Sequence, residues 1–126
     1  MTAQKKILIV DDEPDTCEYL ATFLGDNGYA TVIAKDGGDA AEKFAAESPD
    51  LITLDITMPE KSGVRFYRDM KEDPKRKDVP IVIITGVSED FEKFISSRRQ
   101  VPPPEGYVAK PVDLDKLLAL VKEHIG

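Results

Sequence analysis

Residues 51–59 read LITLDITMP, in which four mostly apolar residues lead into an aspartate, Asp55, and a proline follows four positions later. A near-continuous apolar run of this length is typical of a strand covered on both faces, as in a parallel sheet. Such a strand should not end on a carboxylate beside the core unless the charge has a function there. The stretch therefore predicts a central strand and raises the question of what Asp55 does.

Two runs of the same kind, ILIV at 7–10 and IVII at 81–84, predict further buried strands. Weaker runs at 31–34 and 107–109 have more polar flanks, as expected for edge strands. Helical patterns separate the runs, and we expect helices at 14–26, 38–47, 63–72, 88–98 and from about Asp113 onward. The alternation predicts a doubly wound (βα)₅ fold of the flavodoxin-like type, a three-layer α/β sandwich whose parallel sheet has the order 2-1-3-4-5.

Length and composition fit one globular domain. The chain has 126 residues, of which 41% are hydrophobic, so residues 1–126 are expected to form a single domain with its own core. No apolar run approaches the roughly 20 residues that span a bilayer, and the run after Lys6 is too short for a signal peptide. Cys17 is the single cysteine and is expected to be a buried, apolar-like thiol. We therefore expect a cytoplasmic protein that does not associate with membranes.

The net charge of −7 argues against direct nucleic acid binding by this domain, because phosphate contacts need clustered lysines and arginines. The local basic stretch from Lys75 to Lys77 is flanked by acids and prolines, so it is expected to be a solvated loop.

Chemistry-bearing residues collect where the predicted strands end. Ligands bind outside the carboxyl ends of parallel strands where the strand order reverses, here between the first and third strands. Asp11 and Asp12 follow the first strand and Asp55 ends the third, and neighbouring strands lie about 4.8 Å apart. Carboxylates at this spacing repel one another unless a cation is present, and oxygen ligands suit Mg²⁺ or a similar hard ion such as Mn²⁺.

Two more side chains are expected at this edge. Thr85 adds a hydroxyl after the fourth strand, and Lys110 adds an ammonium after the fifth. Together with the carboxylates they predict phosphoryl transfer to Asp55, with the phosphoryl oxygens held by Thr85 and Lys110. Each residue alone has an ordinary interpretation, as a helix-start acid, a turn residue, a β-former or a surface lysine. Their coincidence at the carboxyl ends of four strands favours the phosphoryl-transfer site.

Four motifs, ILIVDDEPD, LITLDITMPEKSG, PIVIITG and GYVAKP, carry a resemblance that runs from Lys5 to about Glu123. In their order and spacing the chain resembles the receiver domain of two-component response regulators, of the chemotaxis-regulator type. The resemblance implies that Asp55 is the phosphoacceptor. It also implies that Asp11, Asp12, Asp55 and the backbone carbonyl of Thr57 bind Mg²⁺.

The same resemblance implies roles for four residues near the ends of the fourth and fifth strands. Thr85 resembles the switch hydroxyl, Tyr107 the aromatic residue that swings inward with it, and Lys110 the phosphate-binding lysine. The peptide bond before Pro111 is expected to be cis, which is uncommon for proline in general.

The function that the resemblance implies is a phosphorylation-driven switch. A sensor histidine kinase, a phosphotransfer protein or a small phosphodonor would supply the phosphoryl group. The domain would catalyse only its own phosphorylation and dephosphorylation, so we do not expect an enzyme. The surface formed by the fourth helix, fifth strand and fifth helix would change and control a downstream protein or an output domain.

The chain departs from the receiver pattern in two places. The segment before the fifth strand, SSRRQVPPPEG, carries three prolines, Pro102 to Pro104, which favour an extended segment and place dimerisation through this face in doubt. Thr57 and Val87 occupy positions that tune dephosphorylation in the family. Neither side chain obviously aids an attacking water, so we expect a long-lived phosphoryl group.

Three alternatives remain open from the sequence. A Mg²⁺-dependent phosphatase of the haloacid dehalogenase type also uses an aspartyl nucleophile, but it needs an acid two residues later, where this chain has Thr57. A module that keeps the receiver fold but binds partners independently of phosphate is the second. A flavodoxin-like cofactor binder is the third, and the acidic loop after the first strand argues against it because it would repel a phosphate.

Overall fold

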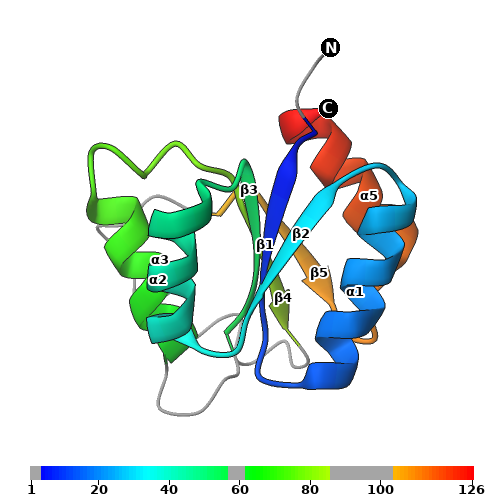
Figure 1. Ribbon diagram of the computed structural model, residues 1–126, viewed down its shortest axis with the longest axis horizontal. Helices are drawn as coiled ribbons and strands as arrows, with labels where there is room; N and C mark the ends of the chain where they lie inside the picture. Colours follow the sequence, from blue (N-terminus) through cyan, green and yellow to red (C-terminus); the bar gives the residue numbers. More distant parts are fainter. Residues whose placement is uncertain (1–3, 57–61, 86–103) are drawn as a thin grey trace.

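In the part of the chain that the computed structural model describes, residues 4–56, 62–85 and 104–126, five parallel strands form one sheet ordered β2-β1-β3-β4-β5 (Figure 1). The side chains of Ser62 and Thr85 lie outside that description. The strands are β1 (Lys6–Val10), β2 (Ala30–Ala34), β3 (Leu51–Asp55), β4 (Ile81–Thr85) and β5 (Gly106–Ala109). The predicted strand order is confirmed.

Four helices lie in the described residues and cover both faces of the sheet. They are α1 (Pro14–Asp26), α2 (Gly37–Glu47), α3 (Ser62–Glu72) and α5 (Leu114–Ile125). Figure 1 shows α1 and α5 on one face and α2 and α3 on the other, which gives the predicted three-layer sandwich. The helix expected at 88–98 lies outside the described residues, as do Pro102 and Pro103.

The sheet separates two apolar clusters because successive side chains of a strand point to opposite faces. Ile7 and Ile9 of β1 belong to the cluster under α1 and α5, while Leu8 and Val10 belong to the cluster under α2 and α3. All four residues of β1 from Ile7 onward and all of β3 are buried, whereas β2 and β5 are largely half-buried, as expected of edge strands.

The helix ends follow their local sequence. Pro14 is the first residue of α1, where the missing N–H costs nothing. Asp36 caps α2 by accepting from the backbone N–H of Asp39, and Asp113 caps α5 by accepting from that of Lys116. Cys17 lies on the inner face of α1 and is 3% exposed, which confirms the predicted buried thiol.

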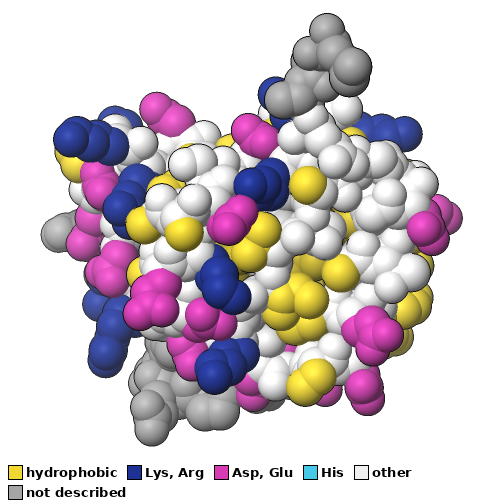
Figure 2. Space-filling model, in the orientation of Figure 1, with side chains coloured by type: hydrophobic (Ala, Val, Ile, Leu, Met, Phe, Trp, Pro, Cys, Tyr) yellow, Lys and Arg dark blue, Asp and Glu magenta, His cyan; other side chains and the backbone are white. Residues whose placement is uncertain are grey.

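The surface carries charge of both signs. Figure 2 shows basic and acidic side chains interspersed over α2 and α3, on the side where Lys75 to Lys77 form a turn after α3. Within the described residues, we find no helix with the length and apolar character needed to cross a membrane.

Candidate functional site

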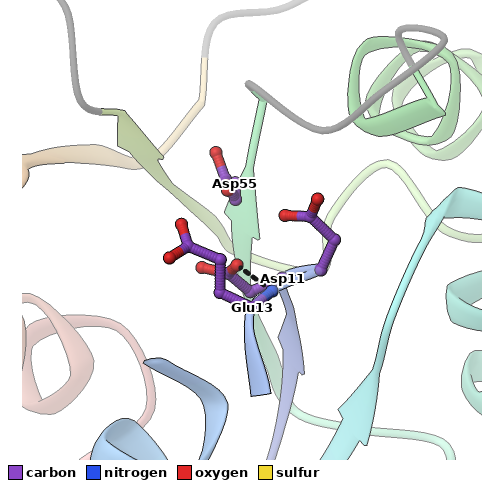
Figure 3. Close-up of side chains that lie close together, drawn as sticks. Asp11, Glu13 and Asp55 are labelled. Carbon is purple, nitrogen blue, oxygen red and sulfur yellow. Dashed lines mark hydrogen bonds between the residues drawn. The ribbon is translucent and has the colours of Figure 1, made fainter. Parts of the chain in front are cut away.

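The acidic residues predicted from the sequence meet at the carboxyl edge of the sheet. Asp55 is the last residue of β3, and Asp11 directly follows β1, whose Val10 is paired with Leu54. Carboxylate oxygens of Asp11, Asp12, Glu13 and Asp55 all lie within 4.8 Å of one another. Figure 3 shows Asp55 facing Asp11 and Glu13 across this edge. Asp11 and Asp55 are buried, at 3% and 2% exposure, whereas Asp12 and Glu13 are exposed.

Backbone contacts fix the loop that carries these acids. The N–H of Asp11 donates to the carbonyl of Ala34 at 3.0 Å, which extends the β1–β2 pairing by one residue. The Asp11 Oδ1 atom accepts from the N–H of Glu13 at 2.9 Å (Figure 3), and the Cys17 thiol donates to the Asp11 carbonyl at 3.3 Å. The Asp11 carboxylate is therefore held in place with its Oδ2 atom directed to the site.

Lys110 reaches this cluster from the end of β5, two strands away from Asp55. Its Nζ atom lies 3.2 Å from Asp55 Oδ2, 3.3 Å from Asp11 Oδ2 and 3.4 Å from Glu13 Oε1. The side chain is only 19% exposed. The Lys110–Pro111 peptide bond is cis, in agreement with the expectation from the sequence.

The pKa shifts of this cluster have two competing causes, burial and neighbouring charge. Burial raises the pKa of Asp11 above its ordinary value, and the Asp55 carboxylate raises it further, against the Glu13 backbone hydrogen bond and Lys110. Burial alone would lower the pKa of Lys110, but the Asp55 and Asp11 carboxylates outweigh it and raise that pKa. The site therefore favours a cation and disfavours further negative charge.

The donor set suits a hard divalent cation. Lys110 brings one positive charge to four carboxylates, so a net negative charge remains when all are ionised. The candidate ligand atoms that the described residues bring together are carboxylate oxygens, which is the chemistry that Mg²⁺ prefers. Asp11, Asp12 and Asp55 could hold such an ion, as expected from the sequence.

The other predicted site residues are only partly described. Thr85 ends β4 and pairs with Ala109, so its backbone is at the carboxyl edge, but its side chain lies outside the described residues. Thr57 and Val87 lie outside them entirely. Tyr107 is half-buried on β5 and packs against the core cluster under α2 and α3. The structure therefore brings Asp11, Asp12, Asp55 and Lys110 together and leaves the role of the others as a prediction.

Glu13 is the member of the cluster that sequence reasoning did not assign to the site. The signal was present, because Glu13 is the third of three consecutive acids after β1. From the sequence, an acid at that position has the ordinary interpretation of favouring the N-terminus of a helix. The Glu13 side chain, however, makes no capping hydrogen bond to α1. It contacts Lys110 instead.

Comparison with known proteins shows which protein family this chain resembles. The family model of the response regulator receiver domain matches residues 7–122. Protein Rrf1 of Nitratidesulfovibrio vulgaris is 37% identical over 116 residues, which cover 92% of this chain and 79% of Rrf1. Protein PilH of Pseudomonas aeruginosa is 31% identical over 116 residues, which cover 92% of this chain and 93% of PilH.

Solved structures agree with the sequence comparison. Chemotaxis protein CheY4 of Vibrio cholerae matches with a TM-score of 0.81 at 26% identity, over 98% of this chain and 100% of CheY4. The signal receiver domain of a signal transduction histidine kinase from Syntrophus aciditrophicus matches with a TM-score of 0.84 at 28% identity, over 96% of this chain and 89% of that one. The chain therefore belongs to the response regulator receiver domain family.

Proposed function

We propose that this receiver domain is a signalling switch in which Asp55 accepts a phosphoryl group. Receiver domains are phosphorylation-responsive switches, so the coarse function follows from the family. The observation that supports Asp55 as the acceptor is its position, at the end of a central strand, 2% exposed and 3.2 Å from the Lys110 ammonium. A buried carboxylate with a lysine and further acids beside it is arranged for nucleophilic attack on phosphorus.

In the proposed reaction an Asp55 carboxylate oxygen attacks the phosphorus of a phosphohistidine, or of a small acyl phosphate. A new P–O bond forms, the P–N or P–O bond to the donor breaks, and its electron pair leaves with the donor. Lys110 moves from the carboxylate to a phosphoryl oxygen, where its charge offsets the negative charge that arrives. Mg²⁺ held by Asp11, Asp12 and Asp55, with Mn²⁺ as a substitute, supplies positive charge that screens the nucleophile from the phosphate.

Four further residues, Thr57, Thr85, Val87 and Tyr107, complete the proposal. The Thr57 carbonyl is a proposed further ligand of the cation, and the Thr85 hydroxyl a proposed partner of the phosphoryl oxygens. Tyr107 is proposed to change its position with Thr85 and so to alter the surface made by β5, α5 and the helix expected at 88–98. Thr57 and Val87 are proposed to leave the phosphoryl group long-lived.

The proposed partners follow from this chemistry. A sensor histidine kinase or a phosphotransfer protein supplies the phosphoryl group, and a downstream protein or an output domain recognises the modified surface. The acidic balance of the chain, −7, supports a protein partner over a nucleic acid. A cytoplasmic location would supply both partners and stays part of the proposal.

The experiment is incubation with Mg²⁺ and acetyl phosphate, followed by intact-mass measurement. We expect the mass of one phosphoryl group on the wild-type protein and none on Asp55→Asn. Asp26→Asn, which removes an exposed acid at the end of α1, is the matched control and should be modified like the wild type. Absence of the adduct although Mg²⁺ binds would overturn the proposal, and sustained turnover of p-nitrophenyl phosphate would favour the phosphatase alternative.

A further inference from the structure

Glu13 touches the site through Lys110. Its Oε1 atom lies 3.4 Å from Lys110 Nζ, while its backbone N–H donates to Asp11 Oδ1. The Glu13 side chain is 65% exposed, so it stands at the rim, whereas Asp11 and Asp55 are almost fully enclosed. It is the N-cap residue of α1, yet its carboxylate makes no capping hydrogen bond, so the helix does not explain its position.

Among the residues that the structure describes, the other two partners of Lys110 are carboxylates that the proposed cation also needs. Lys110 contacts Oδ2 of both Asp11 and Asp55, and the Oδ1 atom of Asp11 already accepts the Glu13 N–H. An ammonium and a divalent cation therefore compete for the same oxygens. When the cation takes them, the enclosed ammonium needs another anionic partner, because a desolvated charge without one is costly.

We propose that Glu13 is a positioning residue for Lys110: its carboxylate holds the ammonium at the rim of the site when a divalent cation occupies Asp11 and Asp55. The inference rests on the proposed function, since it concerns the cation site and the phosphate-binding lysine of that same mechanism. A lysine held at the rim is placed at the entrance, where an incoming phosphoryl group arrives. Without Glu13, Lys110 remains on the two enclosed carboxylates and opposes the cation.

The first experiment measures Mg²⁺ affinity from the amide shifts of ¹⁵N-labelled protein, which also reports whether each variant is folded. Glu13→Gln keeps the size of the side chain and removes its charge. We expect it to weaken Mg²⁺ binding by about three- to tenfold, because the ammonium that Glu13 no longer holds competes with the cation for the Asp11 and Asp55 oxygens. Asp15→Asn, an exposed acid in the first turn of α1, is the matched control and should change the affinity by less than about twofold.

The second experiment separates positioning of Lys110 from a direct effect of Glu13 on the cation. Glu13→Gln is repeated in a Lys110→Gln background, with Lys110→Ala as a second background in case one variant folds poorly. If Glu13 acts through Lys110, its replacement there should weaken Mg²⁺ binding clearly less than in the wild type, because only the direct loss of one charge remains when the coupling between the two residues is gone. An equal loss of affinity with and without Lys110 would overturn the proposal and make Glu13 a direct cation ligand.

Two further outcomes separate this inference from the proposed function. A wild-type protein that binds no Mg²⁺ and gains no phosphoryl group overturns both. A wild-type protein that is phosphorylated on Asp55, while Glu13→Gln binds Mg²⁺ as tightly as the wild type, overturns the role of Glu13 alone.

Discussion

Two enclosed lysines lie at opposite edges of the sheet and differ in how their charge is balanced. Lys110 lies at the carboxyl edge among several carboxylates. Lys71, the penultimate residue of α3, lies at the amino edge, and its side chain is 1% exposed. Its Nζ atom lies 2.8 Å and 3.0 Å from the two carboxylate oxygens of Glu105, a residue 34 positions away that directly precedes β5.

The surroundings of Lys71 leave little charge unmatched. Beyond Glu105, its ammonium donates to the carbonyls of Lys77 at 3.1 Å and Val79 at 3.5 Å. Glu105 Oε1 also accepts from the backbone N–H of Ile81 at 2.7 Å. One ammonium meets one carboxylate, and backbone groups satisfy the remaining hydrogen-bonding positions, so this pair ties α3 to the starts of β4 and β5.

The comparison separates a balanced ion pair, that of Lys71, from the unbalanced cluster around Lys110 on which the proposed function rests. In the described part of the chain, Lys71 and Glu105 balance each other one to one, and both Glu105 oxygens accept from the ammonium. At the carboxyl edge, four carboxylates lie close together and one ammonium contacts three of them, so a surplus of negative charge remains that would favour the proposed cation. An enclosed lysine is therefore not by itself a sign of function, and it is the excess of carboxylates around Lys110 that supports the proposed site.

The largest expected effect is the loss of stability in Lys71→Met. Removing the ammonium leaves the half-buried Glu105 carboxylate, 26% exposed, without its charged partner, which should lower the free energy of unfolding by about 3 kcal/mol. Lys6→Met is the matched control, because the Lys6–Glu47 pair has the similar distance of 2.9 Å but side chains that are 31% and 40% exposed. That variant should lose less than about 1 kcal/mol in urea unfolding. Equal losses would contradict the structural role of Lys71.

Lys110→Met should lower the free energy of unfolding by less than Lys71→Met. We expect a loss of about 1–2 kcal/mol without Mg²⁺, because the enclosed Asp11 carboxyl, whose pKa is already raised, can take up a proton when the ammonium is gone. Saturating Mg²⁺ should stabilise Lys110→Met more than the wild type, because no ammonium competes for the oxygens. Thermal unfolding with and without Mg²⁺ measures both. A Mg²⁺ effect that is equal in wild type and Lys110→Met would contradict the competition.

A smaller effect is expected in how the free energy of unfolding depends on pH, because of the surplus negative charge around Asp11. Burial and then the Asp55 carboxylate raise the pKa of Asp11, so the folded state binds this proton more tightly than the unfolded state. Ionised Asp11 therefore opposes folding above its raised pKa, and the cost is relieved as the pH falls toward the ordinary value of 3.8. Asp11→Asn should be more stable than the wild type at neutral pH, with a gap in urea midpoint that narrows on acidification. If the difference in urea midpoint between Asp11→Asn and the wild type did not change with pH, the surplus negative charge around Asp11 would not be its cause.

The smallest effect is expected at Cys17, beside the acidic loop. Burial, followed by the Asp11 and Asp12 carboxylates, raises the pKa of this thiol to about 11. Alkylation by iodoacetamide at pH 8 should be slow in the native protein and fast in urea, because the thiolate is the reactive form. Asp11→Asn should accelerate the native reaction only slightly, since burial is the larger cause. Rapid native alkylation would show that the helix packing around Cys17 opens readily.

Much of the fold was readable because its signals are local. Apolar runs located five strands, and proline at 14 and aspartates at 36 and 113 stand at helix starts. The position of Asp55 after a central strand was enough to place it with Asp11 and Asp12, because the carboxyl ends of neighbouring parallel strands share one edge. For the same reason Lys110, which follows the fifth strand, could be predicted to lie near Asp55 at the carboxyl edge.

Contacts between side chains that lie far apart in the sequence follow from no periodicity and are visible only in the folded structure. The strand order and the residues gathered at the carboxyl edge were predictable from the sequence, since these depend on pattern and connection rules. It gave no sign that Lys71 is enclosed by Glu105, because lysine is normally solvated and the pair is 34 residues apart. The sequence also did not show whether Glu13 only favours the start of α1 or contacts Lys110. That depends on the position of the Lys110 ammonium in the folded structure.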